Sequence, residues 1–426
     1  MRLHIKKLVY GGDGLGRDAE GRTVFVPYVL PGEVVDVAVT GERDGALKSQ
    51  LVTVERASPA RVTAGCRHFG RCGGCQYQHA AYDAQLALKL SILRETLERA
   101  GVHDQPEVIV HAGEPWGYRN RIRLRVDRAA GQIRVGYNLR ETREFLPIEE
   151  CPIAAPLLWR AAAALVELGR STPVGARWLR ATAEVELFTT KDERSLQMTL
   201  LLREQRSAGF AALCERLRAE IPELVGAGAV VGRGREDVTW GRGGLSYNVD
   251  GSGYWVSRGG FFQVNRWMLE ELVRVVMAGR NGLRAWDLFA GVGLFSRVLA
   301  EGFTQVVAVE ANALAVKDLT AMKAGNMRGF AGSVVDFLRS AAVGREPPEL
   351  VVMDPPRAGV GREVCEILVR MQVPEIVYVS CDPTTLARDL GGMVDSGYNL
   401  AELHLVDLFP QTFHLETVAV LQRKSW

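Results

Sequence analysis

The chain has 426 residues, of which 47% are hydrophobic and 24% are charged, and its formal net charge is only +2. This composition is typical of a soluble globular protein with enough apolar material for two or three ordinary domains. The near-neutral total gives no indication of nucleic-acid binding, so any such affinity must come from local basic surfaces. No run approaches the length of a membrane span, and residues 1–7 lack an apolar signal core. We therefore expect a cytoplasmic monomer that does not bind a membrane.

Residues 1–58 alternate short runs of β-branched residues with turn signals, which predicts a small β-barrel of about five strands. The clearest strand-like runs are residues 24–27, 33–39 and 51–54, and the turns are at Gly11-Gly12, Pro31-Gly32 and Asp44-Gly45. The pattern resembles the TRAM domain, an oligonucleotide-binding-type barrel at the front of several RNA-modifying enzymes, and so implies RNA binding. A purely structural barrel is the alternative, because acids nearly balance the lysines and arginines here.

Three cysteines, Cys66, Cys72 and Cys75, lie close together in a segment rich in glycine. Seven cysteines in a long cytosolic chain do not indicate a disulfide framework. Closely spaced thiolates separated by glycines indicate metal ligation, because small residues let the chain wrap around an ion or cluster. Cys151 is the best candidate for a fourth ligand, since two of the remaining cysteines lie in apolar helical patterns. The spacing alone allows either zinc or an iron–sulfur cluster.

Residues 59–262 mix helical and strand patterns, which predicts a central α+β domain. Within it, residues 80–100 have leucines at helical spacing and are expected to form an amphipathic scaffold helix, which could pack on the catalytic domain. Residues 155–235 contain no catalytic motif.

Arginines alternate with apolar residues along residues 118–126 of this domain. Arg119, Arg121, Arg123 and Arg125 fall on one side of the predicted strand, and apolar residues fall on the other. Guanidinium groups suit phosphate oxygens, so this row is interpreted as an RNA-backbone contact. A solvated edge strand is the alternative.

Residues 263–426 alternate apolar strands with helical patterns, which predicts a doubly wound α/β domain. A strand ending at Leu288 leads into the glycine turn of Gly291 and Gly293. The next strand ends in Glu310, about twenty residues after the turn, where an acid can accept hydrogen bonds from ribose hydroxyls. A third strand ends in Asp354-Pro355-Pro356-Arg357. Open parallel sheets bind ligands at the carboxyl ends of their strands, so we expect these segments to meet.

Cys381 follows a fourth apolar strand, residues 375–379, in the segment Ser380-Cys381-Asp382-Pro383. This position displays the thiol at a strand end, and Asp382-Pro383 is typical of a helix start. The positive end of that helix is expected to favour the thiolate, which is the nucleophilic form. A small apolar core cysteine is the alternative.

The glycine turn, the acid on the next strand, Asp-Pro-Pro-Arg and Ser-Cys-Asp-Pro together resemble the S-adenosylmethionine-dependent RNA uridine-5 methyltransferases. A nicotinamide cofactor fits less well, because the turn lacks the third glycine of the dinucleotide fingerprint. The resemblance implies a Rossmann-like methyltransferase domain at residues 263–426. In the ribosomal-RNA branch of this family, the same cysteine arrangement surrounds a [4Fe–4S] cluster. The resemblance therefore implies a central iron–sulfur domain and a cluster bound by Cys66, Cys72, Cys75 and Cys151.

The resemblance also implies roles for individual residues. Cys381 is expected to attack C6 of uracil, which makes C5 nucleophilic toward the methyl donor, and Glu416 is expected to remove the C5 proton. His414 is a rival base on chemistry alone. Asp354 is expected to orient the pyrimidine edge or the cofactor amine, and Phe261 to lie near the target base. The expected contacts to S-adenosylmethionine are Gln263, Phe289, Gly291, Gly293, Glu310, Asp336 and Asp354.

The expected partner is RNA, with 23S ribosomal RNA favoured because the barrel and four cysteines are typical of that branch. A transfer-RNA uridine-5 methyltransferase of the same family is the alternative substrate class. A cytosine-5 RNA methyltransferase is disfavoured, because Pro356 stands where that group has a second cysteine. A non-catalytic iron–sulfur RNA-binding protein is the alternative from a different class.

Overall fold

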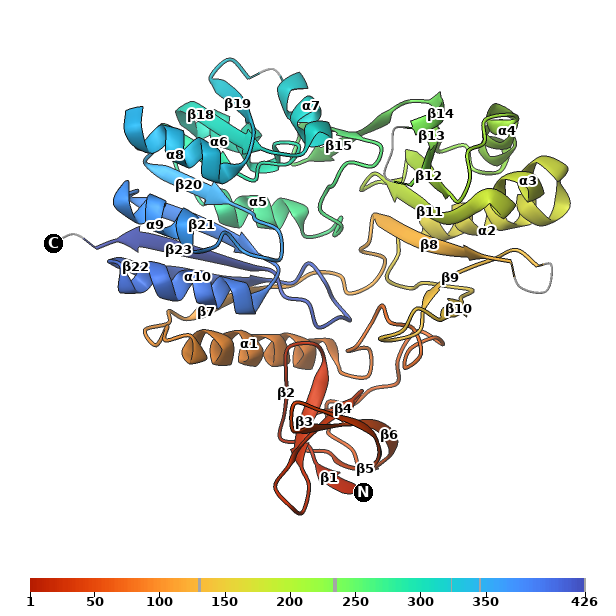
Figure 1. The fold of residues 1–426 in the computed structure, drawn as a ribbon, viewed down its shortest axis with the longest axis horizontal. Coiled ribbons are helices and arrows are strands. Elements are labelled where there is room, and N and C mark those ends of the chain that lie inside the picture. Colours follow the sequence, from red (N-terminus) through yellow and green to blue (C-terminus); the bar gives the residue numbers. More distant parts are fainter. Residues whose placement is uncertain (129–131, 233–235, 323, 345, 425–426) are drawn as a thin grey trace.

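The computed structural model describes residues 1–426 except 129–131, 233–235, 323, 345 and 425–426. The structure has three parts: a small curled sheet, a central sheet and a larger α/β unit (Figure 1). Within the described ranges, no helix is both long and apolar enough to cross a membrane.

The N-terminal part is a six-stranded sheet that curls around its own apolar residues. Its strands are β1 (Arg2–His4), β2 (Lys7–Leu8), β3 (Asp13–Arg17), β4 (Thr23–Pro27), β5 (Val34–Arg43) and β6 (Ala46–Arg56). Their order is β1-β5-β6-β4-β3-β2. The curl is tight, because a Cβ at Gly14 would lie only 2.3 Å from Val29. A small β-barrel was predicted, and the sheet has one strand more than expected because residues 2–4 pair with β5.

The central part is a seven-stranded sheet with helices packed against one face. Its strands are β8 (Arg121–Asp127), β9 (Arg134–Asn138), β10 (Phe145–Pro147), β11 (Thr182–Thr189), β12 (Leu196–Leu202), β13 (Leu224–Val231) and β14 (Glu236–Gly241). The helices are α2 (Pro156–Ser171), α3 (Pro173–Ala181) and α4 (Phe210–Glu220). The apolar side of β8, with Ile122, Leu124 and Val126, belongs to the same core as these helices. The arginine side of β8 therefore faces away from the helices.

The third part is an eight-stranded sheet of order β19-β18-β17-β20-β21-β23-β22-β7. Its strands are β7 (Val108–His111), β17 (Gly282–Leu288), β18 (Phe303–Glu310), β19 (Met327–Ala331), β20 (Leu350–Met353), β21 (Glu375–Ser380), β22 (Tyr398–Val406) and β23 (Thr417–Arg423). Strands β17 to β21 are parallel, whereas β23 is antiparallel to both β21 and β22. This confirms the Rossmann-like α/β fold and its closing antiparallel pair.

Helices cover both faces of this sheet, which is why its parallel strands are continuous apolar runs. The helices are α1 (Tyr82–Arg99), α5 (Leu269–Met277), α6 (Leu294–Gly302), α7 (Ala313–Ala321), α8 (Val334–Gly344), α9 (Arg362–Arg370) and α10 (Pro383–Asp395). The hairpin of β15 (Gly244–Val249) and β16 (Ser252–Ser257) packs on the α5 and α6 side. Helix α5 begins at Leu269, after a local turn in which the Asn265 side chain accepts hydrogen bonds from the amides of Trp267 and Met268.

Two elements that precede the central sheet belong to the α/β unit in space. Helix α1 packs against α10, and β7 pairs in parallel with β22 at the edge of the eight-stranded sheet. The α/β unit is therefore formed by two separate stretches of the chain, one before and one after the central sheet.

A fully buried ion pair fastens α1 to the segment that follows β22. Lys89 Nζ lies 2.6 Å from Asp407 Oδ1, and both side chains are inaccessible to solvent. The hydroxyl of Tyr82 donates to the other Asp407 oxygen at 2.9 Å, and Lys89 Nζ also donates to the Phe409 carbonyl at 2.9 Å. Because every charge in this group is paired, burial of the pair is tolerated.

We predict that Lys89→Met lowers the free energy of unfolding by about 3–5 kcal/mol, because it leaves the Asp407 carboxylate buried without its counter-ion. Lys48→Met is the matched control, since Lys48 pairs with Glu141 at 3.2 Å on the surface and such pairs contribute about 0–1 kcal/mol. Urea unfolding of both variants measures the difference. Equal, small losses would contradict the importance of the buried pair.

Candidate active site and cysteine-lined cavity

The carboxyl ends of four neighbouring parallel strands meet at one edge of the α/β sheet. In spatial order β18-β17-β20-β21, these ends carry Glu310, the glycine turn, Asp354 and Cys381. The sequence analysis expected these segments to converge, and the strand order explains it, because adjacent parallel strands present their carboxyl ends side by side.

The glycine turn after β17 leaves one side of the backbone open. Phe289, Gly291 and Gly293 have positive φ angles of 65°, 56° and 87°. A Cβ at Gly291 would meet no atom within 4 Å, whereas one at Gly293 would lie 2.7 Å from Leu319. Gly293 is therefore required for packing, and Gly291 leaves space in which a ligand can approach the main chain.

Glu310 already holds this turn in shape. One carboxylate oxygen accepts from the Gly291 amide at 2.8 Å, and the other accepts from the Asn312 amide at 2.6 Å. Each carboxylate oxygen has a further lone pair, so Glu310 can still accept hydrogen bonds from hydroxyl groups of a ligand.

Buried carboxyl groups gather beside the turn. Burial raises the pKa of Asp287 to about 7, although the Ser296 hydroxyl donates to this carboxyl group. Burial and the neighbouring Asp287 raise the pKa of Asp354 to about 7, and the Gln263 amide donates to Asp354 at 3.1 Å. Such perturbed acids in one place are typical of functional sites.

Cys381 is half-buried at the end of β21, and its surroundings favour the thiol. Burial, Glu416 and Asp354 raise its pKa to about 11, while the Arg357 guanidinium acts in the opposite direction. The expectation that the start of α10 favours the thiolate was wrong. The amides of Thr384 and Thr385 donate to the Asp382 carboxylate at 2.9 and 3.3 Å, so a fixed negative charge already occupies the helix end.

Glu416 and His414 differ sharply as bases. Glu416 is 2% exposed, burial and Asp354 raise its pKa well above the usual value, and its Oε1 has no hydrogen-bond partner among the described residues. Burial and Arg357 lower the pKa of His414 to about 3, and Arg357 Nη2 lies 3.1 Å from the His414 ring. An imidazole with such a low pKa is a weak base, so the pKa shifts favour Glu416 over His414 as the base.

Phe261 and Asp336, expected near the target base and the cofactor, lie in an exposed position and in a helix turn respectively. Phe261 is 67% exposed, whereas its neighbour Phe262 is buried in the core. Asp336 lies in the first turn of α8, where its carboxylate accepts from the Ser333 hydroxyl at 2.7 Å and its amide donates to that hydroxyl at 3.1 Å. These two hydrogen bonds between Ser333 and Asp336 cap the start of α8.

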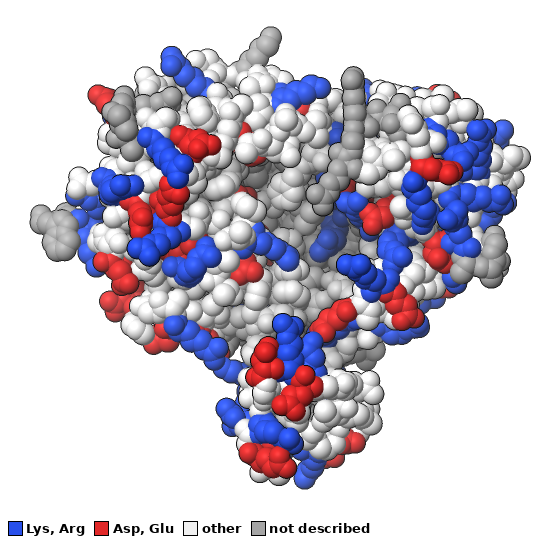
Figure 2. Space-filling view, in the orientation of Figure 1, with Lys and Arg blue, Asp and Glu red and all other residues white. Residues whose placement is uncertain are grey.

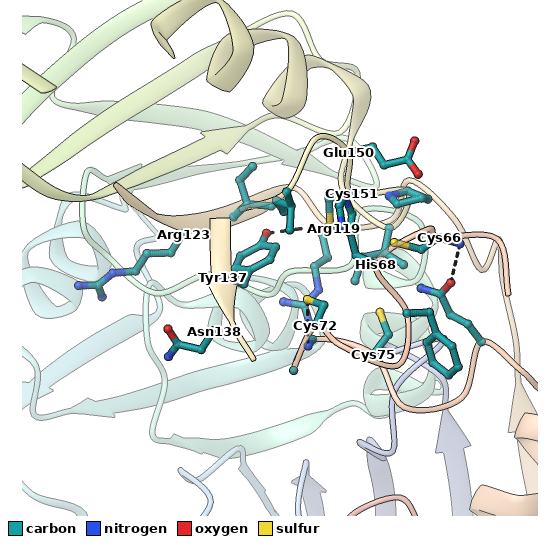
Figure 3. A pocket seen from close by; sticks show the side chains of 18 of the residues that line it. Cys66, His68, Cys72, Cys75, Arg119, Arg123, Tyr137, Asn138, Glu150 and Cys151 are labelled. Carbon is teal, nitrogen blue, oxygen red and sulfur yellow. Dashed lines mark hydrogen bonds between the residues drawn. The ribbon is translucent and has the colours of Figure 1, made fainter. Parts of the chain in front are cut away.

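A second site is a cavity of about 560 Å³ between the cysteine-bearing segment and the central sheet. Figure 3 shows side chains that line this cavity. Its lining includes Cys66, Cys72, Cys75 and Cys151, and none of these cysteines forms a disulfide. Burial raises the pKa of Cys75 to about 12 and that of Cys151 to about 11. Among the described residues, no three His, Cys, Asp or Glu side chains are arranged to hold a single metal ion.

The arginine side of β8 faces this cavity. Arg119, Arg121 and Arg123 all line it. Arg119 Nε is buried without a hydrogen-bond partner among the described residues, and Arg121 donates to the Gly260 carbonyl at 2.6 Å. The edge-strand alternative is wrong, because β8 lies between β9 and β11.

The outer arginines of the row are closer to solvent. The side chain of Arg123 is 53% exposed and pairs with Glu184 at 2.5 Å, and Arg125 donates to Asn138 at 2.6 Å. Figure 2 shows lysine and arginine side chains on both sides of a hollow between the α/β unit and the central part.

Tyr10 lies near Cys381, although no sequence signal indicates it. Tyr10, between β2 and β3, donates from its hydroxyl to the Cys381 carbonyl and to Asp382 at 3.4 Å each. Its ring also packs edge-on against Phe413 at 5.3 Å. No local pattern reveals such a contact, because 371 positions separate Tyr10 from Cys381.

Two family models match the chain: a TRAM domain at residues 1–52 and a tRNA (uracil-5-)-methyltransferase model at residues 338–424. A relative in Halomonas elongata, named 23S rRNA (uracil(1939)-C(5))-methyltransferase RlmD, is 32% identical over 99% of this chain and 89% of its own. The protein of that name in Chromohalobacter salexigens is 34% identical, with the same coverage.

A solved structure with a similar fold is that of the Pyrococcus abyssi tRNA (uracil-54, C5)-methyltransferase in complex with S-adenosyl-L-homocysteine. It is 25% identical, has a TM-score of 0.77, and the match covers 99% of this chain and all of the other. The similarity therefore extends over the barrel and the central part as well as the α/β unit.

We predict that iodoacetamide modifies Cys381 slowly at pH 7 and faster as the pH rises toward 11, because the thiolate fraction increases up to the pKa. Arg357→Met should slow this modification at any pH below 11, since the guanidinium stabilises the thiolate. Mass spectrometry of the Cys381 peptide measures the rate. Arg362→Met, at an exposed arginine paired with Glu366, is the control and should react like the wild type.

Proposed function

The chain belongs to the RNA uracil-C5 methyltransferases, and on this premise we propose that it forms 5-methyluridine in 23S ribosomal RNA. The observation that carries the proposal is the meeting of Cys381, Glu416 and Asp354 beside the glycine turn. The relatives named above, which match 99% of this chain, support ribosomal RNA as the substrate.

The nucleophile in the proposed reaction is Cys381. Its sulfur forms a bond to C6 of the target uracil, and the electron pair of the C5–C6 double bond makes C5 nucleophilic. The raised pKa of Cys381 favours the thiol, so the thiol proton has to pass to solvent before the sulfur attacks, and Arg357 is placed to stabilise the thiolate. Asp354 lies within electrostatic reach of the thiol and can orient the pyrimidine edge.

Glu416 is proposed as the base of the second half of the reaction. Once C5 is methylated, the carboxylate removes the C5 proton, and the electron pair left on C5 restores the double bond and expels the Cys381 sulfur from C6. The raised pKa makes Glu416 a stronger base than an ordinary carboxylate, provided that it has lost its own proton. The low pKa of His414 argues against it in this role.

The residues at the strand ends fit S-adenosylmethionine, which supplies an electrophilic methyl group when it is bound. Gly291 leaves open space beside its backbone, and Phe289 and Gly293 shape the same turn. The carboxylate of Glu310 can accept from ribose hydroxyls. Gln263 and Asp354, already joined by a hydrogen bond, complete the proposed cofactor contacts.

The cysteine-lined cavity is proposed to hold a [4Fe–4S] cluster. Such a cluster takes four thiolate ligands, and Cys66, Cys72, Cys75 and Cys151 line one cavity. Four thiolates around a cluster carry net negative charge, which Arg119 can balance from the cavity wall. Zinc takes the same thiolate donors, so the metal content of the purified protein distinguishes the two.

RNA is proposed to lie over the hollow between the parts of the protein. The barrel, Arg123 and Arg125 can contact the backbone, and the exposed ring of Phe261 can stack on the flipped-out base. Arg119 and Arg121 are less available, because the first lines the cysteine cavity and the second bonds to Gly260.

The decisive experiment is incubation of the pure protein with labelled S-adenosylmethionine and transcripts of 23S ribosomal RNA or transfer RNA. The proposal expects 5-methyluridine in the ribosomal transcript. Methylation of transfer RNA alone would contradict the ribosomal substrate, and binding without methyl transfer would contradict the enzyme.

We predict that Cys381→Ala abolishes methylation, whereas Glu416→Gln forms the covalent adduct and cannot resolve it. Denaturing gel electrophoresis with labelled RNA should show a stable protein–RNA complex for Glu416→Gln only. Cys214→Ala is the matched control, because Cys214 is fully buried in the central part away from the site. A fully active Cys381→Ala would overturn the mechanism.

We predict that Cys151→Ala binds less iron than the wild type when both are purified without oxygen, because one of four ligands is lost. Iron content and visible absorption measure the loss, and Cys214→Ala should match the wild type. Stoichiometric zinc in the wild-type protein, without iron, would contradict the proposed cluster.

A further inference from the structure

The segment that leads to Glu416 is joined through Gln411 to the wall of the cysteine-lined cavity. The Gln411 carbonyl accepts hydrogen bonds from the amides of Gln76 and Tyr77, at 3.0 Å each. Gln76 directly follows the cavity residue Cys75, and its side chain donates to the Gly73 carbonyl at 2.9 Å. The cysteine-bearing segment therefore contacts the catalytic segment through main-chain atoms, which move only with the segment as a whole.

Gln411 is also fixed from the opposite side by helix α1. The Gln85 side-chain amide donates to Gln411 Oε1 at 3.0 Å, and the Gln411 main-chain N–H donates to Gln85 Oε1 at 2.9 Å. Both side chains are almost completely buried, with exposed fractions of 1% and 3%. Gln411 has a positive φ of 69°, a backbone conformation that the surrounding hydrogen bonds have to hold in place.

A second link joins the same two regions. The Tyr118 hydroxyl donates to the Pro410 carbonyl at 3.0 Å, and Tyr118 directly precedes Arg119 in the cavity wall. Residues 410 and 411 are thus held by two of the chain segments that line the cavity.

We propose that Gln411 is a positioning residue through which the cysteine-lined cavity fixes the Glu416 carboxylate for removal of the C5 proton. The inference rests on the proposed methyl transfer, because proton removal is one of its steps. Gln411 acts through the chain that leads to Glu416. A displacement of that carboxylate by about 1 Å is enough to slow the proton transfer on the order of 100-fold.

The test replaces Gln411 by Met, which keeps the length of the side chain and removes the amide. In single turnovers with uridine-containing RNA, the Cys381 adduct should form at close to the wild-type rate. The conversion of this adduct to 5-methyluridine should be slower by about 10- to 100-fold. A protein–RNA complex that resists denaturation should therefore accumulate. General loss of structure would slow both steps together and leave no such complex.

Gln197→Met is the matched control. Gln197 is also buried and donates to two backbone carbonyls, those of Arg242 and Gly244, but it lies in the central sheet. It should resolve the adduct at the wild-type rate. Gln85→Met is the second test variant, since it removes both hydrogen bonds between α1 and Gln411, whereas Gln411→Met removes one, and it decides the question if Gln411→Met does not fold.

A second measurement does not depend on activity. Amide hydrogen exchange of residues 409–416 should become faster in Gln411→Met, in Gln85→Met, and in wild-type protein stripped of iron by an oxidant and a chelator. It should stay unchanged in Gln197→Met. Unchanged exchange in the stripped protein would overturn the link to the cavity.

The outcomes separate this inference from the proposed function. If the wild type forms neither adduct nor 5-methyluridine, the proposed function fails. If the wild type methylates RNA, and folded Gln411→Met and Gln85→Met resolve the adduct at its rate, only the positioning role of Gln411 fails.

Discussion

The segment from Asp407 to Glu416 carries the proposed base, and its anchoring is the constraint on which the site depends. Its backbone is largely irregular, so its buried carbonyls need donors from elsewhere. Lys89 donates to the Phe409 carbonyl, Asn265 to that of Leu408 and Tyr118 to that of Pro410. These donors come from α1, from the approach to α5 and from the approach to β8. Catalytic geometry is therefore a property of the whole chain and not of the α/β unit alone.

The candidate active site contains several acidic side chains and one nearby arginine, Arg357. Asp287 raises the pKa of the half-buried Asp354, and Asp354 raises the pKa of Glu416. Leaving acids buried without full hydrogen bonding costs stability, and proteins keep such groups where function needs them. Arg357 lies at the surface of this group and is the side chain that lowers the pKa of Cys381. The surroundings of Cys381, the proposed nucleophile, thus favour the thiol over the thiolate.

The N-terminal barrel is fixed to the rest of the protein by contacts of different kinds. Arg61 pairs with the fully buried Glu33 at 2.6 Å, and Arg140 of the central part pairs with Asp13 at 2.5 Å. Tyr10 contacts the backbone of Cys381 itself. RNA held by the barrel would consequently lie in a defined position relative to the nucleophile, because the connection is made by packed side chains and not by a flexible linker.

The sequence by itself determined the TRAM barrel, the Rossmann-like sheet and the meeting of the glycine turn with Cys381, because periodicity and strand-end motifs are local signals. It did not determine the charge environment of Cys381, since the two acids that raise its pKa, Asp354 and Glu416, lie on segments far apart in the chain. It allowed residues 80–100 to pack on the α/β unit, but it could not place β7 there, or indicate Gln411 and Tyr10, whose partners lie hundreds of positions away. Only tertiary structure decided these features, because electrostatic and hydrogen-bond environments depend on distance in space, which the order of residues does not encode locally.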